Sequence, residues 1–356
     1  MELFLELIQV ALGHKMELSR TYSPDEWQEA FEFSNNQTME GIALTGIEAL
    51  PTVQQPPKDL VLQWTFNCGY FASKNARLDK ASQKVIQNLA RQGWRSCVLK
   101  GQGIATLYPV PNRRHPGDID VWIDAPAEDI IKYAHKYCPD ASVGYHHVEF
   151  PIWDEISIEL HYFPSFLYSP AADRNLQDFF ERSKDRVMSH QVRLADGVSV
   201  ATCPDAEFNA VYLLCHLFKH LMDEIIVLRQ YMDYYYVLRA IDNSDMRVRI
   251  AAEVEKIGLT GMAKGVMFVL KELFGLEEKY MFVEPDEKFG LFLKKEALKG
   301  NIVADLDRFF EKNTFIRLSN QLRRGMVTAR YFPKESLWSP LARFSHWKKR
   351  RTYKNL

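Results

Sequence analysis

Two aspartates separated by one residue, Asp118 and Asp120, are the side chains of this sequence best suited to chemistry. They open an apolar stretch, Asp118–Ile123, that is typical of a β-strand. Residues two apart in a strand share a face, so both carboxylates project together while Ile119 and Val121 point into the core. Because neighbouring carboxylates repel each other, the pair indicates a cation between them. Such pairs also occur by chance on solvated strands, so a metal site can be inferred only from the surrounding residues.

A third carboxylate, Glu159, stands in the middle of a second strand-like stretch, Ile156–Tyr162. Strict alternation puts its apolar residues on one face and its polar residues, including Glu159 and His161, on the other. A carboxylate in that position fits a metal site. A half-exposed edge strand with one wet face is the alternative.

The strand predicted at Ser96–Leu99 is followed by Lys100-Gly101 and by a helical stretch, Gly103–Tyr108. Backbone amides after Gly101 are suited to phosphate oxygens. Arg114 lies in the loop before the aspartates, and its planar guanidinium suits bidentate phosphate contact. Three carboxylates beside a phosphate-binding turn are what two-metal nucleotidyl transfer needs, because the metal ions neutralise charge at the α-phosphate and the leaving pyrophosphate.

These residues lie in a segment where strands and helices alternate. Strands are predicted at 96–99, 118–123, 148–152 and 156–162, and helices at 103–108 and 127–137, which indicates a small mixed sheet. Helical periodicity dominates on both sides, with a helix start at Ser23, a long helix from Leu60 to Gln92, and helices over 173–193, 204–241, 248–276 and 288–312. We therefore expect an α+β fold with an N-terminal helical region (1–92), an α/β core (93–200) and a C-terminal helical region (201–356).

Composition describes an ordinary globular chain of 356 residues, with 47% hydrophobic and 26% charged residues. The formal net charge of −1 excludes a globally basic nucleic-acid binder but not a local basic groove. Five scattered cysteines without C-x-x-C spacing favour neither a disulfide framework nor a zinc ribbon. The N-terminus has no basic signal region, and no apolar run approaches the about 18–20 residues of a membrane span. We expect a cytoplasmic protein.

The block from Leu99 to Asp120 resembles a bacterial branch of uncharacterised nucleotidyltransferases in the DNA polymerase β-like superfamily. The matching residues are Leu99-Lys100-Gly101, Ile104, Tyr108-Pro109, Arg114 and Gly117-Asp118-Ile119-Asp120. Ile158–His161 resembles the strand that bears the third acid in this branch, and the helical segment from His216 to Asp233 also resembles part of it. The resemblance covers roughly residues 60–240.

The resemblance implies a mixed-sheet catalytic core, dependence on Mg²⁺ (or Mn²⁺) and a nucleoside triphosphate (NTP), such as ATP, as donor. Asp118 and Asp120 would bind both metal ions, and Glu159 would complete the site. The implied nucleotide-binding residues are Lys100, Gly101, Gln102, Arg114 and Gly117. The superfamily usually has Gly-Ser in the turn where this chain has Gly101-Gln102, so the mode of triphosphate binding stays open.

Further candidates for the wall of the cleft are His147, His161, Arg229 and Asp233, with His146 beside them. Structural or exposed histidines are an equal alternative for His146 and His147. Arg229 and Asp233 are four apart on a helix, where they either form a salt bridge or meet the cleft. His216 and His220 are also four apart, but Leu217 replaces the glutamate of the zinc-protease motif, so core or interface histidines are favoured.

The sequence thus predicts a metal-dependent nucleotidyltransferase that moves a nucleoside monophosphate (NMP) group from an NTP to an acceptor. A small molecule, a protein and an RNA all remain open as acceptor, with no membrane partner. Near-neutral charge disfavours nucleic acid, whereas the basic C-terminal segment from Arg343 is either a solvated tail or a phosphate-contacting arm. A catalytically inactive nucleotide-binding or regulatory module on the same fold is the alternative.

Overall fold

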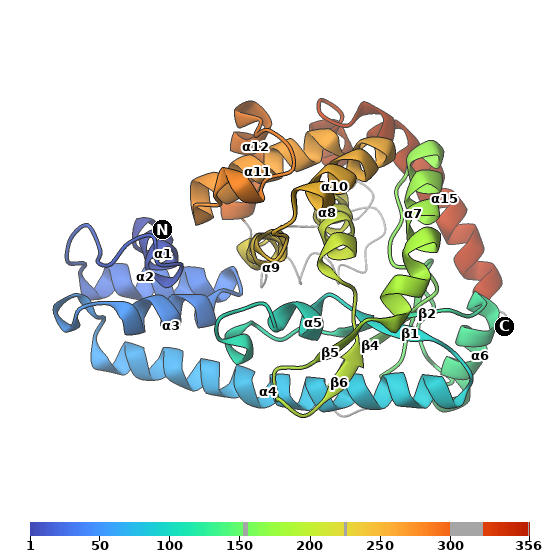
Figure 1. The fold of residues 1–356 in the computed structure, drawn as a ribbon, viewed down its shortest axis with the longest axis horizontal. Helices are drawn as coiled ribbons and strands as arrows, with labels where there is room; N and C mark the ends of the chain where they lie inside the picture. The colour runs from blue at the N-terminus through green and yellow to red at the C-terminus, as the bar shows by residue number, and fades with distance from the viewer. Residues whose placement is uncertain (152–155, 224–225, 300–322, 355) are drawn as a thin grey trace.

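The computed structural model describes residues 1–151, 156–223, 226–299, 323–354 and 356. Helices surround a small sheet in this part of the chain (Figure 1). The long helix α4 (Lys58–Arg91) runs along one edge of the molecule, below both the N-terminal helices and the sheet. Before it come α1 (Glu2–Ala11), α2 (Pro24–Asn36), α3 (Glu40–Ala49) and the short 3₁₀ helix η1 (Thr52–Gln54).

The sheet contains β1 (Ser96–Leu99), β2 (Ile119–Ile123), β3 (His147–Glu149) and β4 (Ile158–His161), in the order β1-β2-β4-β3. β2 and β4 are parallel, whereas β1 and β3 run antiparallel to their neighbours. The predicted mixed sheet is therefore confirmed. β1 has the predicted bounds, β2 and β4 are shorter than predicted, and β3 begins one residue earlier and ends at Glu149. Asp118 therefore lies just before β2 rather than in it. Between the strands lie α5 (Gly101–Ala105), η2 (Pro111–Arg113) and α6 (Ala127–Tyr137).

The two faces of the sheet have different neighbours. Val98, Val121 and Leu160 belong to one core, which they share with the C-terminal half of α4 and with α6. Trp122 points the other way and packs against Phe180 and Phe208 of the following helices. Asp120 and His161 alternate with the first set, so they lie on the face turned toward those helices.

The segment 173–193, predicted to be helical throughout, ends its helix early. α7 (Pro170–Ser189) is followed by β5 (Gln191–Arg193), which pairs with β6 (Val200–Thr202) in a separate two-stranded sheet. A turn at 195–197 joins them, with Gly197 at φ +72°, a conformation that glycine adopts without a steric penalty. The prediction failed for 191–193 because pairing with a later strand, not local periodicity, makes this piece extended.

The C-terminal region is helical, as predicted, but the helix predicted over 204–241 is divided into two, because residues 226 and 227 are not helical. It contains α8 (Ala206–Asp223), α9 (Leu228–Arg239), α10 (Ser244–Ile257), α11 (Thr260–Phe274), η3 (Glu278–Tyr280), α12 (Glu287–Lys299) and α15 (Pro333–Tyr353). The end of the helix predicted at 288–312 lies outside the described residues. None of the described helices is both long and apolar enough to cross a membrane.

The basic C-terminal segment is not an extended tail. Most of it belongs to α15, whose inner face is anchored by His346 stacked on Tyr145 (ring centroids 3.6 Å apart) and by Tyr353 against Tyr162. Its basic run, Lys348–Arg351, is exposed. The division of the chain at residues 92 and 200 stays a prediction, and α4 of the first region packs on β1 and β6.

Local signals at helix ends behave as predicted. Ser23 caps α2 in a reciprocal capping box with Glu26, which satisfies two backbone donors at the helix start. α4 ends at Arg91, and Gly93 follows at φ +82°. Such a residue stops a helix because the left-handed conformation does not continue it.

Candidate functional site

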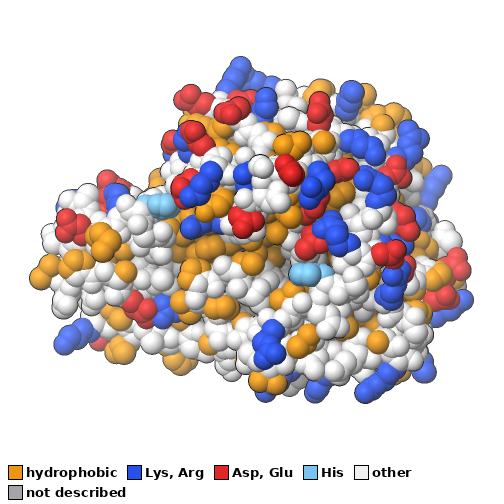
Figure 2. Space-filling model, in the orientation of Figure 1, with side chains coloured by type: hydrophobic (Ala, Val, Ile, Leu, Met, Phe, Trp, Pro, Cys, Tyr) orange, Lys and Arg blue, Asp and Glu red, His pale blue; other side chains and the backbone are white. Residues whose placement is uncertain are grey.

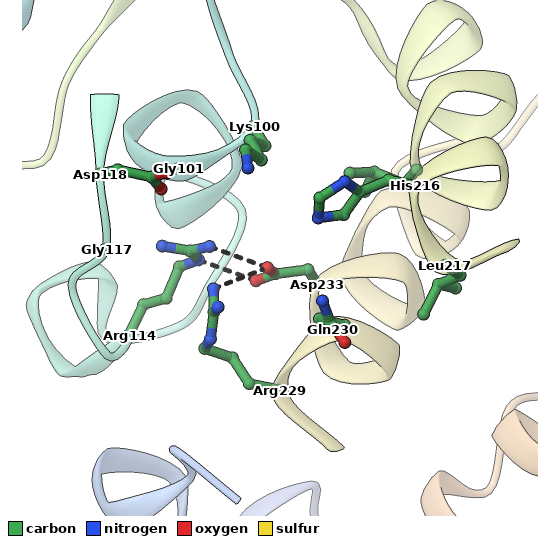
Figure 3. A pocket seen from close by; sticks show the side chains of 11 residues that line it. Lys100, Gly101, Arg114, Gly117, Asp118, His216, Leu217, Arg229, Gln230 and Asp233 are labelled. Atoms are coloured by element: carbon green, nitrogen blue, oxygen red, sulfur yellow. Dashed lines mark hydrogen bonds and ion pairs between the residues drawn. The ribbon is translucent and has the colours of Figure 1, made fainter. Parts of the chain in front are cut away.

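The parallel pairing of β2 and β4 sets Asp120 opposite Glu159. Asp120 is only 2% exposed, whereas Glu159 and Asp118 are half-buried. Asp118 lies one residue before β2, and its side chain lines a pocket (Figure 3). The structure thus brings the three predicted carboxylates to the same end of the two central strands.

His161 joins two of these carboxylates. Its Nε2 lies 2.9 Å from Asp120 Oδ1 and 3.2 Å from Glu159 Oε2. Burial lowers the pKa of His161, but the two hydrogen-bonded carboxylates outweigh it and raise this pKa to about 9. Burial likewise raises the pKa values of Asp120 and Glu159, and neighbouring cationic groups bring both below their ordinary values. The charged form of both carboxylates is therefore favoured.

Lys100 supplies a second cation at the cluster. Its Nζ lies 3.0 Å from Asp120 Oδ2. Burial lowers the pKa of Lys100, but Asp118 and Asp120 together raise it well above its ordinary value. Lys100 has φ +43° and Gly101 has φ +49°. Positive φ is uncommon for a residue with a side chain, and such strain persists where the surrounding structure enforces it. The turn therefore holds the ammonium group at the carboxylates.

The pocket lies between the Lys100-Gly101 turn, the loop before β2, and helices α8 and α9. Its cationic side chains are Lys100, Arg114 and Arg229, and its acidic ones are Asp118 and Asp233. The other lining residues are Gly101, Gly117, Leu213, His216, Leu217 and Gln230. Figure 2 shows this face of the molecule hollowed between the upper helices and the lower layer, with hydrophobic side chains gathered in the hollow. A charged pocket of this kind suits a polyanion that brings its own cation.

Arg114 lies at the wall of the pocket, as predicted, but its guanidinium is engaged by Asp233. Arg114 is 2% exposed, and its Nε and Nη2 each donate a 2.8 Å hydrogen bond to a different Asp233 oxygen. Tyr108 also donates to Asp233, over 2.6 Å. Burial raises the pKa of Asp233, but Arg114 lowers it below the ordinary value. Arg114 therefore has a buried protein partner where the sequence predicted phosphate.

Arg229 shares the same carboxylate at longer range, with its Nη1 3.5 Å from Asp233 Oδ2, so the predicted salt bridge and the predicted place at the cleft are both present (Figure 3). Burial, and then repulsion from Arg114, lowers the pKa of Arg229. One carboxylate thus serves two guanidinium groups. Arg229 is the less neutralised of the pair.

Gln102 does not line the pocket. Its side chain is 1% exposed and donates a 2.5 Å hydrogen bond to Asp79 on α4. Asn75, one turn earlier on α4, donates to the carbonyl oxygen of Arg114 over 2.9 Å. These two contacts attach α4 to the turn and to the loop that carry the site. Sequence reasoning missed both Asp79 and Asn75, because their partners are distant in the chain.

The candidate histidines divide into two groups. His147 Nδ1 lies 3.3 Å from Glu159 Oε2, and burial lowers the pKa of His147 to about 4. The pKa of His146 is also far below its ordinary value, with burial as the main cause. His216 lines the pocket, and its Nε2 lies 3.1 Å from that of His220. In the described part of the chain, this second pair lacks the third ligand that a metal site would need.

The carboxylates fit a divalent cation. Ligand atoms of Asp120, Glu159 and His161 all lie within 4.8 Å of one another. Asp120 Oδ2 is buried, and Lys100 Nζ lies 3.0 Å from it, so a cation bound to this oxygen would take the place of the ammonium group. Oxygen ligands of this kind are those that Mg²⁺ and Mn²⁺ prefer.

A family model matches most of the chain. A model of the family described as "uncharacterised nucleotidyltransferase" matches residues 23–275. Among solved structures, the chain is similar to an antigenic nucleotidyltransferase-like protein from Paracoccidioides brasiliensis, with a TM-score of 0.36 and 11% identity over 60% of this chain and 95% of that chain. Curated proteins give no significant match.

Proposed function

Because the chain belongs to this family of uncharacterised nucleotidyltransferases, we propose that it moves an NMP group from an NTP to an acceptor with the help of a divalent cation. The register of β2 and β4 carries the proposal, since it places Asp120 beside Glu159. Lys100, 3.0 Å from Asp120, lines the pocket together with Asp118. The acceptor oxygen or nitrogen would bond to the α-phosphorus. The bond from that phosphorus to the bridging oxygen would break, and pyrophosphate would leave.

Asp118, Asp120 and Glu159 would hold Mg²⁺ or Mn²⁺. When bound, the ion would neutralise charge on the transferring phosphate and on the leaving group. The Lys100 ammonium, 3.0 Å from Asp120, balances part of the carboxylate charge and lines the same pocket. Lys100 is therefore suited to release the carboxylate of Asp120 and to bind a phosphate oxygen instead.

Arg229 is a better candidate for phosphate contact than Arg114. Asp233 binds Arg114 through two hydrogen bonds but reaches Arg229 only at 3.5 Å. The two guanidinium groups and one carboxylate carry a net positive charge in a buried place. An anion in the pocket would offset this positive charge. Arg229 would gain more from the anion than Arg114, because Asp233 neutralises Arg229 less.

The test compares two aspartates of the same strand region. Asp118→Asn is expected to lower Mg²⁺-dependent pyrophosphate release, and transfer of label from an α-labelled NTP, by about 100-fold or more, because it removes one charged ligand from the site. Asp124→Asn is the matched control, since Asp124 pairs with Arg95 away from the pocket. Sugars, a protein mixture and tRNA serve as trial acceptors.

Unchanged transfer by Asp118→Asn would refute the catalytic assignment. An NTP that binds the wild type with Mg²⁺ but never releases pyrophosphate would support the inactive nucleotide-binding module instead. Calorimetry with a non-hydrolysable NTP, with and without Mg²⁺, separates these outcomes because it needs no acceptor.

A further inference from the structure

Three histidines lie side by side at the edge of the carboxylate cluster, and the transfer reaction proposed above does not use them. His146 immediately precedes β3, His147 begins it, and His161 ends β4. One ring nitrogen from each lies within 4.8 Å of those of the other two. We propose that these three imidazoles form a second metal site, which binds a transition-metal dication of the Zn²⁺ class.

The ring contacts show that the three side chains converge. The ring centroids of His146 and His147 are 4.6 Å apart, and those of His161 lie 5.1 Å and 5.2 Å from them. His147 and His161 face each other directly in the antiparallel pairing of β3 with β4. The backbone of two strands thus fixes two of the ligands, and the third is the neighbour of one of them in sequence.

One buried ring nitrogen of this group is unpaired. His161 is 3% exposed, and its Nε2 is bound to Asp120, so Nδ1 is the nitrogen left over. This Nδ1 is buried without a hydrogen-bond partner in the described part of the structure, whereas His147 Nδ1 lies 3.3 Å from Glu159 Oε2. A buried polar atom without a partner costs free energy. A metal ion bound at His161 Nδ1 would remove that cost and would displace the proton that this nitrogen carries in the imidazolium form.

The surroundings have the features of an outer coordination shell. Histidines that bind metals usually donate their other N–H group to a carboxylate, which orients the ring. Asp120 Oδ1 stands 2.9 Å from His161 Nε2 in that position. The ring of Phe166 lies 5.2 Å from that of His146, with the Lys219 ammonium over its face.

Donor type separates this site from the magnesium site. Imidazole nitrogens select Zn²⁺, Co²⁺ or Ni²⁺, whereas Mg²⁺ prefers oxygen. Three protein nitrogens leave the fourth position of tetrahedral zinc open to water or another ligand. The metal would link β3 to β4 and hold His161, the hydrogen-bond partner of Asp120, in place. It would therefore stabilise the position of the carboxylates. Asp118 belongs to the predicted magnesium set and not to the histidine group.

The experiment titrates the full chain, stripped of metal, with Zn²⁺ and with Co²⁺ in the presence of excess Mg²⁺. The expected result is one ion per chain, with visible cobalt absorption typical of nitrogen ligation. His146→Gln should weaken binding by more than about tenfold, the loss that even an outer-shell partner causes. The matched control is His135→Gln, since this histidine lies outside the group and its Nε2 is 3.4 Å from the carbonyl oxygen of Ala141.

Asp118→Asn keeps the two proposals distinguishable, because it should abolish transfer and leave zinc binding unchanged. The histidine site is overturned if the wild type binds no zinc, if His146→Gln binds it like the wild type, or if Asp118→Asn abolishes binding. Should His146→Gln not fold, the wild type decides the matter by thermal unfolding. A rise in Tm with Zn²⁺ that Mg²⁺ does not reproduce supports the site, and no rise refutes it.

Discussion

Replacing Asp233 with asparagine should reveal how the arginines of the pocket are held. Asp233 is the shared partner of Arg114 and Arg229, and both Asp233 and Arg114 are almost inaccessible to solvent. Asn keeps the shape of the side chain but removes its charge, so the buried Arg114 and the half-buried Arg229 would lose their shared counterion. Breaking a buried pair from one side costs about 3–5 kcal/mol. We expect a loss of stability of that size.

Urea unfolding, followed by tryptophan fluorescence and by circular dichroism, measures the loss through the transition midpoint. The matched control is Glu278→Gln, which removes an exposed partner of Lys271 and should leave the midpoint where it is. Pyrophosphate provides a second comparison. Because an anion in the pocket would replace the missing carboxylate, pyrophosphate should stabilise Asp233→Asn more than it stabilises the wild type.

Two results would refute this reasoning. A midpoint for Asp233→Asn equal to that of the surface control would mean that the buried pair does not stabilise the fold. Equal stabilisation of variant and wild type by pyrophosphate would mean that the anion binds elsewhere. Replacing both partners, as in Arg114→Met with Asp233→Leu, should cost less than the sum of the single changes, because the buried guanidinium and the buried carboxylate are then both absent and only the half-buried Arg229 loses its partner.

Three further predictions concern the site and its surroundings. Gly101→Ala places a side chain at φ +49° and should lower the free energy of unfolding by roughly 1–2 kcal/mol, as measured by thermal unfolding. Gly69→Ala, in an open position on α4, should not destabilise the protein. Equal effects of the two substitutions would contradict backbone strain at Gly101. Lys100→Met should tighten Mg²⁺ binding in calorimetry and weaken NTP binding, since it removes the cation from Asp120; weaker Mg²⁺ binding would contradict the proposed ligands. Burial raises the pKa of Asp124, but hydrogen bonds from Arg95 and Lys184 bring it below its ordinary value. Asp124→Asn should therefore be less stable than the wild type at neutral pH, and this difference should vanish in acid, where the carboxylate of the wild type is protonated. A difference that persists in strong acid would refute this.

Local sequence determined a large part of the fold. Alternation over Asp118–Ile123 and Ile156–Tyr162 predicted which side chains face the core, and burial of Val121 and Leu160 agrees with it. The cap at Ser23 and the stop at Gly93 were predictable because backbone groups near a helix end are satisfied by residues a few positions away. Where a partner belongs to the same turn or strand, the pattern is visible in a single sequence.

The candidate carboxylates were also predictable as a set, because the two strands that bear them alternate clearly and the motif around Lys100 resembles a family. Their catalytic role stays a prediction. What the sequence did not show is that His161 sits between two of them. That contact depends on the register of β2 against β4, since a shift by one residue would turn Glu159 to the opposite face.

Only the tertiary structure decided the partners of the remaining residues. Arg114, predicted to contact phosphate, meets a carboxylate 119 positions later in the chain, and Gln102 turns away from the pocket to Asp79 on α4. β5 is extended because it pairs with β6, and α15 is anchored by ring contacts with distant aromatic residues. Periodicity encodes which face of an element is buried. It does not encode which side chain from another element arrives there, because that depends on how the elements pack.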